Sequence, residues 1–287
     1  MKALTWLIAL SAVLSAPALA LEALDDEALA DTLGRDGLTI TLDPADAYTF
    51  STILHDSDGF SGFTTPGAFV LGNPLGGATG HTPTSIDPGA NPITILIDAT
   101  GDIDSGTAGS QASLSINVTL PADTIIHTGT LSIARSNGTG TSITNQSSVI
   151  LNDMTITLPG PTVLAMTLGN EAADGQMMRL TTNMTNGLTI SNFAIRDATA
   201  TGANGYAIRA DSIAVTNAGD TNLDVDLKID AASTGLVTTF TQLGSDTNGM
   251  DIKMNNLRLG DSTSNSMGNL HILGLNMNDA TLRISGH

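Results

Sequence analysis

Five aspartates in two short runs have the spacing of calcium-binding turns. They are Asp56 and Asp58 in the run HDSDG, and Asp98, Asp102 and Asp104 in the run DATGDID. Alternate carboxylates near a glycine can wrap around a hard cation such as Ca²⁺. The helix–loop–helix frame and the closing glutamate of the EF-hand loop are missing, so metal-free turns rich in aspartate explain both runs equally well. Calcium is therefore the one possible cofactor that the sequence indicates.

A third set of carboxylates alternates with apolar residues in the run LDVDLKID. Asp224, Asp226 and Asp230 would share the solvent-facing side of one strand, where Lys228 interrupts them. Carboxylates at this spacing could flank a glycosidic bond or hold a metal. A solvated strand face is the simpler explanation.

No run in the sequence has the pattern of a nucleophilic or metalloprotease site. Gly260-Asp261-Ser262 is similar to the nucleophile block of one lipase class, but it lies near the C-terminus with no helix predicted after it. G-x-S-x-G and H-E-x-x-H are both missing, and the five histidines are scattered. We therefore expect no enzymatic activity. The alternative is a calcium-supported carbohydrate-binding or carbohydrate-active β-protein.

The first twenty residues have the features of a secretory signal peptide. Lys2 supplies the positive start, an apolar run follows, and Ala18-Leu19-Ala20 is a typical cleavage site. No later segment approaches the roughly 20 apolar residues that a spanning helix needs. We expect a secreted mature chain that starts at Leu21 and does not insert into a membrane once the signal is cleaved.

Charge and cysteine content exclude several classes of protein. The chain has 10 Lys and Arg against 28 Asp and Glu, and no basic residue lies between Arg35 and Arg135. Such a surface repels nucleic acid, so we expect no nucleic-acid partner. The chain has no cysteine, which excludes disulfides, iron–sulfur clusters and thiolate zinc sites. A core of its own must hold this chain together.

The start of the mature chain has the pattern of a short, well-capped helix. Asp25 is a good N-cap residue, and Leu24 and Leu29 have the spacing of a hydrophobic staple. Gly34 is a typical left-handed C-terminal stop. The sequence predicts an N-terminal helix over 21–36 that opens a single β-rich domain over 21–287.

A segment rich in proline and glycine interrupts this domain. Residues 63–92 hold five prolines and six glycines. Proline cannot donate to a strand ladder, so we expect a long loop here instead of regular strands. Long loops in compact proteins are often functional, and this one is our candidate for partner contact.

The rest of the chain has the period of half-buried strands. Apolar residues alternate with polar ones in 93–97, 114–120 and 223–229. The asparagines at 152, 192, 256 and 278 recur in similar runs at intervals of 40, 64 and 22 residues, near multiples of about 21. That period suits the coils of a β-solenoid. The fold class is all-β, a β-solenoid with a short N-terminal capping helix or, as the alternative, a β-sandwich.

Both ends of the chain are similar to one group of proteins. The opening run LEALDDEALADTLGRDGLTI resembles the start of secreted bacterial proteins described as Fil-type pilus-system proteins, in which an L-x-x-L-D-D-x-x-L helix precedes the turn T-G-Q-x-G-[IL]-T-I. Leu33 and Arg35 depart from the Thr and Gln of that turn. The closing run MGNLHILGLNMNDATLRISGH resembles the G-x-L-x-L-x-G-L-N repeat that ends the same group.

The resemblance implies a non-enzymatic structural or adhesion component of the cell surface or of a filament. It places the protein outside the cell or on the outer surface of a Gram-negative bacterium. Its expected partners are further copies of itself or other surface and pilus proteins. Leu24, Asp25, Leu29 and Gly34 would then act in assembly, either by capping the first open strand edge or by docking on another subunit.

Overall fold

The computed structural model describes residues 37–44, 46–56, 62, 64–74, 76, 80–100, 113–169, 176–197, 207–261 and 263–285. The chain divides into two compact units, Met1–Leu38 and Thr39–His287, and nearly all described residues belong to the second unit. The signal peptide and the helix predicted over 21–36, with Leu24, Asp25, Leu29 and Gly34, lie outside the described residues.

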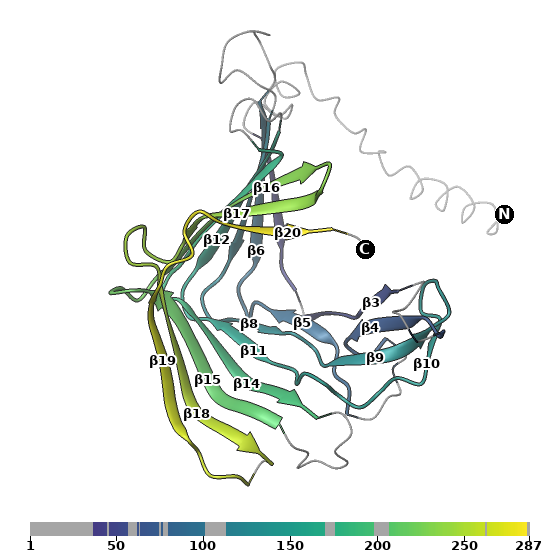
Figure 1. Ribbon diagram of the computed structural model, residues 1–287. Helices are drawn as coiled ribbons and strands as arrows, with labels where there is room; N and C mark the ends of the chain where they lie inside the picture. Colours follow the sequence, from purple (N-terminus) through teal and green to yellow (C-terminus); the bar gives the residue numbers. More distant parts are fainter. Residues whose placement is uncertain are drawn as a thin grey trace, which may run out of the picture. The chain divides into compact units, whose positions relative to one another are not determined.

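The described residues form strands and no helix, which confirms the all-β prediction (Figure 1). Sheet 1 has eight strands in the order β1 (Leu38–Leu42), β6 (Ile93–Thr100), β7 (Ser113–Leu120), β12 (Thr162–Gly169), β13 (Met178–Met184), β16 (Leu223–Ala232), β17 (Gly235–Leu243) and β20 (Ala280–Ile284). Sheet 2 has eight strands in the order β2 (Tyr48–Phe50), β5 (Thr84–Asp87), β8 (Thr124–His127), β11 (Thr155–Leu158), β14 (Leu188–Arg196), β15 (Ala207–Asn217), β18 (Met250–Gly260) and β19 (Gly268–Leu275). A small sheet holds β3 (Thr52–His55), β4 (Gly67–Leu71), β9 (Leu131–Ser136) and β10 (Ile143–Thr144).

The two large sheets meet along a line that we call the spine. Short connections cross it repeatedly, from β7 to β8, from β11 to β12 and from β13 to β14 (Figure 1). The strand ends on both sides pack into one apolar cluster. Its members are Ile93, Ile95, Leu120, Val118, Leu164 and Met184 of sheet 1, and Ile126, Leu158 and Leu188 of sheet 2. The spine therefore contains the hydrophobic core that joins the two sheets.

Each large sheet has one apolar face because its alternating residues line up from strand to strand. One row crosses all of sheet 2: Tyr48, Ile86, Ile126, Ile156, Ile190, Ile213, Met254 and Leu270. A second row crosses sheet 1: Ile97, Ile116, Met166, Leu180, Leu227, Phe240 and Ala280. Residues of the spine cluster lie on these same faces, which we call the inner faces.

The structure does not support the predicted β-solenoid. Pairing is antiparallel in the sheets, whereas the coils of a β-helix stack their strands in parallel, so the sandwich alternative fits better. The recurring asparagines have another cause. Asn152 Nδ2 donates to Asn192 Oδ1 at 3.3 Å, and Asn192 and Asn256 both adopt left-handed φ values, in the two strands that flank β15. Asparagine tolerates this conformation better than most residues.

The prediction of a loop over residues 63–92 is wrong for part of that segment. Strands β4 and β5 lie within it. Pro66 and Pro83 directly precede these strands and Pro88 directly follows β5, so the missing N–H groups remove no ladder bond from a strand interior.

The connection between β4 and β5 is held by a small polar cluster around His81. Gln146 Nε2 donates to His81 Nδ1 at 3.1 Å and to Ser132 Oγ at 2.8 Å. Because Nδ1 accepts a hydrogen bond, the imidazole is neutral in this arrangement. Burial also lowers the pKa of His81 below its ordinary value.

The lowered pKa of His81 predicts a loss of stability in mild acid. The unfolded chain takes up the proton first, so the contribution is fully present above the unfolded pKa of about 6.5 and falls as pH drops from there towards the folded pKa. Urea unfolding at pH 7.5, 6.5 and 5.5 should show this fall in the free energy of unfolding. In His81→Gln the fall should become smaller. His271→Gln, at an exposed site in β19, is the control and should keep it.

Core substitutions should follow the distance from the spine. Leu158 is 4% exposed within the spine cluster, whereas Leu282 in β20 is 48% exposed. Leu158→Ala should lower the free energy of unfolding by about 2–5 kcal/mol, and Leu282→Ala by less than about 1 kcal/mol. Urea denaturation of the two variants at neutral pH measures both. Equal losses would contradict a spine cluster that contributes more to stability than the end strand β20.

Candidate functional site

The structure does not bring the predicted calcium ligands together among the residues it describes. Asp56 follows β3 at the surface, where its backbone N–H donates to the Gly67 carbonyl at 2.9 Å. Asp98 is exposed in β6, opposite Ser115. Asp58, Asp102 and Asp104 lie outside the described residues. No group of three or more His, Asp or Glu side chains forms a metal site within the described part, and calcium binding stays a prediction.

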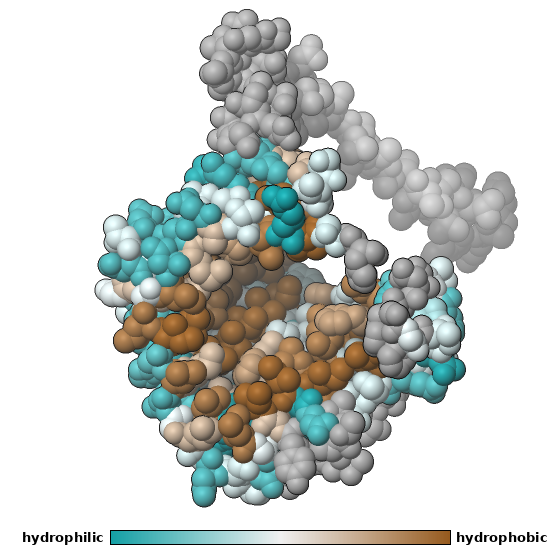
Figure 2. All heavy atoms as spheres, in the orientation of Figure 1, coloured by the Kyte–Doolittle hydropathy of each residue, from teal (hydrophilic) through white to brown (hydrophobic). Residues whose placement is uncertain are grey.

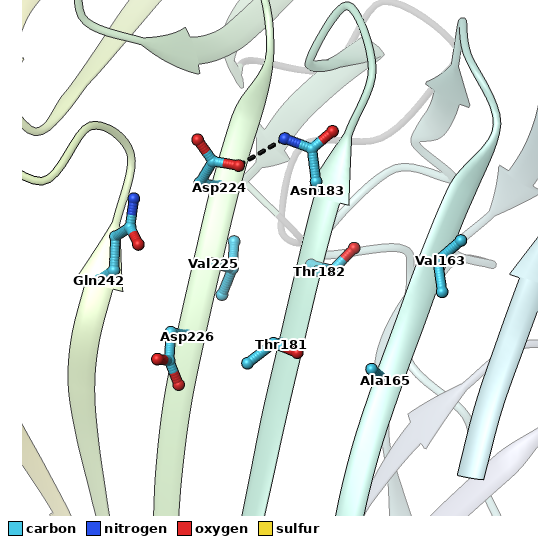
Figure 3. A pocket seen from close by; sticks show the side chains of 9 residues that line it. All are labelled: Val163, Ala165, Thr181, Thr182, Asn183, Asp224, Val225, Asp226 and Gln242. Carbon is cyan, nitrogen blue, oxygen red and sulfur yellow. Dashed lines mark hydrogen bonds between the residues drawn. The ribbon is translucent and has the colours of Figure 1, made fainter.

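The carboxylates of β16 line a shallow hollow of about 370 Å³ on the outer face of sheet 1 (Figure 3). Asp224 and Asp226 project from β16, with Asn183 on β13 and Gln242 on β17 beside them. These residues alternate with those of the inner face, so the hollow opens on the polar side of the sheet.

Each carboxylate of this strand already accepts hydrogen bonds from the chain itself. Arg179 donates to both oxygens of Asp226, through Nε at 3.0 Å and Nη2 at 2.7 Å. Asp224 accepts from the side-chain amides of Asn183 and Asn217. Asp230 accepts the backbone N–H of Met177 at 2.8 Å. A metal ion or a sugar would have to displace these contacts, so the arrangement joins neighbouring strands more readily than it binds a ligand.

Removal of the Asp226 side chain should therefore lower the free energy of unfolding. Its side chain is 12% exposed and that of Arg179 is 39% exposed, so the loss of the partner leaves a partly desolvated guanidinium. Asp226→Ala should lower the free energy of unfolding by about 1–3 kcal/mol. Solvent around the partly exposed arginine screens its charge and keeps the loss within this range. Asp246→Ala, in the exposed turn after β17, is the control and should change it by less than about 0.5 kcal/mol. Chemical denaturation at pH 7 compares the two.

Asp261 of the lipase-like run has a structural role in a turn. It accepts hydrogen bonds from the Thr263 hydroxyl at 2.8 Å, the Thr263 N–H at 2.9 Å and the Ser264 hydroxyl at 3.1 Å. These hydrogen bonds hold the pKa of Asp261 below its ordinary value. Ser262 lies outside the described residues.

The inner faces of the two large sheets carry an extended apolar surface among the described residues. Figure 2 shows apolar side chains gathered in a hollow between the two large sheets. Exposure on these faces is highest on the end strands of the sheets: Leu223 in the interior strand β16 is 2% exposed, whereas Ile284 in the end strand β20 is 56% exposed. Further exposed inner-face residues are Tyr48, Leu236, Leu270, Ile272 and Leu282.

A second apolar row runs along the strand ends far from the spine, and we call it the rim row. It passes from the small sheet into sheet 2 through two single bridges: Leu71, Leu131, Leu151, Ile195, Ile208 and Leu259. Ile195 is 45% exposed and Ile208 is 46% exposed. Contiguous apolar surface of this kind marks a site of contact with another molecule.

Sequence reasoning missed both surfaces. The sequence did carry a signal for an exposed apolar surface. Its strands alternate apolar and polar residues, and no helix is predicted among them, so the apolar faces of the sheets can be covered only by one another. The strand order that lines residues up in rows, and the divergence of the sheets from the spine, depend on pairings between segments distant in sequence.

No family model, curated protein or solved structure matches this chain. Within the described part, no helix has the length and hydrophobicity that a membrane crossing requires.

Proposed function

We propose that this protein is a secreted, non-enzymatic structural component of the cell surface, acting as a subunit that associates with further copies of itself. The observation that carries this proposal is the open pair of inner faces, whose apolar side chains are exposed chiefly on the end strands of the two sheets. A soluble monomer rarely leaves contiguous apolar rows of this length in water.

The physical driving force is the burial of these rows. Each Å² of apolar surface removed from water contributes about 25 cal/mol. Burying the exposed half of a leucine or isoleucine side chain in an interface therefore adds to the free energy of association. A stable protein interface buries roughly 1,200–2,000 Å². Rows that cross eight strands in sheet 2 and seven in sheet 1 extend far enough to supply an area of that order.

Charge supports a self-complementary partner over nucleic acid or an anionic surface. Between Arg35 and Arg135 the chain has carboxylates and no basic residue, whereas Lys253, Arg258 and Arg283 lie in the last three strands. Lys253 and Arg258 pair with Asp251 and Asp211 of the same chain, which leaves Arg283 of the three to face the acidic region of the next copy.

The expected signal peptide and the resemblance of both chain ends to Fil-type pilus-system proteins support the same proposal. Both would place the protein outside the cell, among filament or adhesion components.

Self-association should be measurable and should depend on the apolar surface. Light scattering coupled to gel filtration of the exported protein, from about 1 to 500 μM, should show the mass rising with concentration, with electron microscopy identifying ordered assemblies. Replacing Leu236 and Ile272 of the inner faces with serine should weaken association at least about tenfold, since each buried leucine or isoleucine contributes about 1.5–3 kcal/mol.

Val163→Ser is the matched control, because Val163 is 42% exposed but lies on the outer face of sheet 1. It should leave association unchanged. A protein that stays monomeric at every concentration would contradict the proposed function.

A further inference from the structure

Four exposed strands form the ends of the two large sheets. Sheet 1 ends in β1 and β20, and sheet 2 ends in β2 and β19, so each of the four has a neighbour on only one side within the described sheets. Their residues are exposed almost throughout. Edge strands of this kind present N–H and C=O groups that can pair with another chain.

These edges occur as two pairs, each made by consecutive strands. β1 leads into β2 and β19 leads into β20, and each pair passes from one large sheet to the other. We call β1 and β2 the N-terminal edge pair, and β19 and β20 the C-terminal edge pair. One lies at each end of the strand order in both sheets.

The directions of the two pairs are complementary. Sheet 2 is antiparallel across all its eight strands, so its end strands β2 and β19 run in opposite directions. β19 placed beside β2 of a second copy therefore continues sheet 2 as an antiparallel sheet. Because β1 leads into β2 and β19 leads into β20, the same placement sets β20 beside β1 of that copy and continues sheet 1.

Residue types at the two ends also match. β1 and β20 both have five residues, and in each the apolar residues alternate with polar ones, as Ile40 and Leu42 do with Thr41 and as Leu282 and Ile284 do with Arg283. In sheet 2 the long apolar row begins at Tyr48 and ends at Leu270, so joined copies would extend it.

Charge favours the same contact. Asp43 and Asp46 are exposed next to the N-terminal edge pair, in the stretch that contains no basic residue. Arg283 lies in the C-terminal edge pair and Lys253 lies in the strand beside it. A contact between two identical ends would lose this complementarity.

We propose that a second copy of this chain adds head to tail, with β20 and β19 of one copy pairing with β1 and β2 of the next. This inference rests on the proposed function and specifies its geometry. A head-to-tail contact of this kind does not close on itself by a twofold axis, so it generates a filament or ring instead of a dimer. β19 is bulged twice against β18, whereas β20 joins β17 without interruption, so β20 is the better template of the two.

The absence of native cysteine allows a direct cross-linking test. Thr281→Cys places a thiol on the outer side of β20, and Thr41→Cys or Thr39→Cys places one on β1 in either of two registers. Under oxidation, a mixture of Thr281→Cys and Thr41→Cys (or Thr39→Cys) proteins should give at least about tenfold more disulfide-linked dimer than either protein alone. The double variant should give a ladder of linked multimers.

Two other outcomes would overturn the proposal. Dimers from the Thr281→Cys protein alone would mean that two C-terminal edges meet. A cross-link within one chain between Ala28→Cys and Thr41→Cys would mean that the chain's own N-terminal segment occupies the edge.

A charge on the edge strand provides a second test. Thr281→Lys, on the outer side of β20, should weaken association at least about tenfold, because a charged residue on an edge blocks strand addition. Val163→Lys, on the outer face of the interior strand β12, should have no effect. Circular dichroism checks that both variants keep their strands. Copies that associate without the mixed cross-link, and that tolerate Thr281→Lys, would overturn the head-to-tail contact while leaving the proposed function in place. Failure of all association would remove both.

Discussion

Packing of aliphatic side chains at the spine is the interaction on which both large sheets depend. The spine cluster takes residues from seven strands of the two large sheets, and its buried members are Ile93, Leu120 and Leu158. Away from it, cross-strand pairing and polar contacts on the outer faces hold the strands, as Arg179 does with Asp226. A second buried cluster, around Val70 and Ala134, holds the small sheet, and apolar surface on the end strands of the large sheets stays available for contact.

The strand content could be predicted from the sequence because its signal is local. The runs at 93–97, 114–120 and 223–229 became β6, β7 and β16, each with its apolar residues on the inner face. The solenoid prediction failed because residue spacing does not distinguish parallel from antiparallel stacking. Asn192 and Asn256 recur because both occupy a left-handed position beside the same strand. The loop prediction failed where prolines flank a strand without entering it.

For the carboxylates of β16, the sequence predicted the residue types and their common strand face but not their hydrogen-bond partners. Asp224, Asp226 and Asp230 do lie on the polar face of one strand, but their engagement by Arg179, Asn183, Asn217 and Met177 depends on neighbouring strands. The rim row combines residues from 71 to 259, and its continuity requires two single bridges that no sequence pattern indicates. From its type alone, an apolar residue is predicted to be buried. Whether it is exposed depends on the place of its strand in the sheet, which the sequence pattern does not give.

The strand order has a consequence for how the chain reaches this structure. In both large sheets the order across the sheet follows the order along the chain, from β1 to β20 and from β2 to β19. Each newly added strand therefore finds its neighbour already formed by the residues that precede it, apart from the detour into the small sheet. Folding can advance from the N-terminal end as a growing front of nearest-neighbour contacts, in the manner of repeat proteins. For a chain that emerges N-terminus first from the ribosome, that order limits the time during which unpaired strands are exposed.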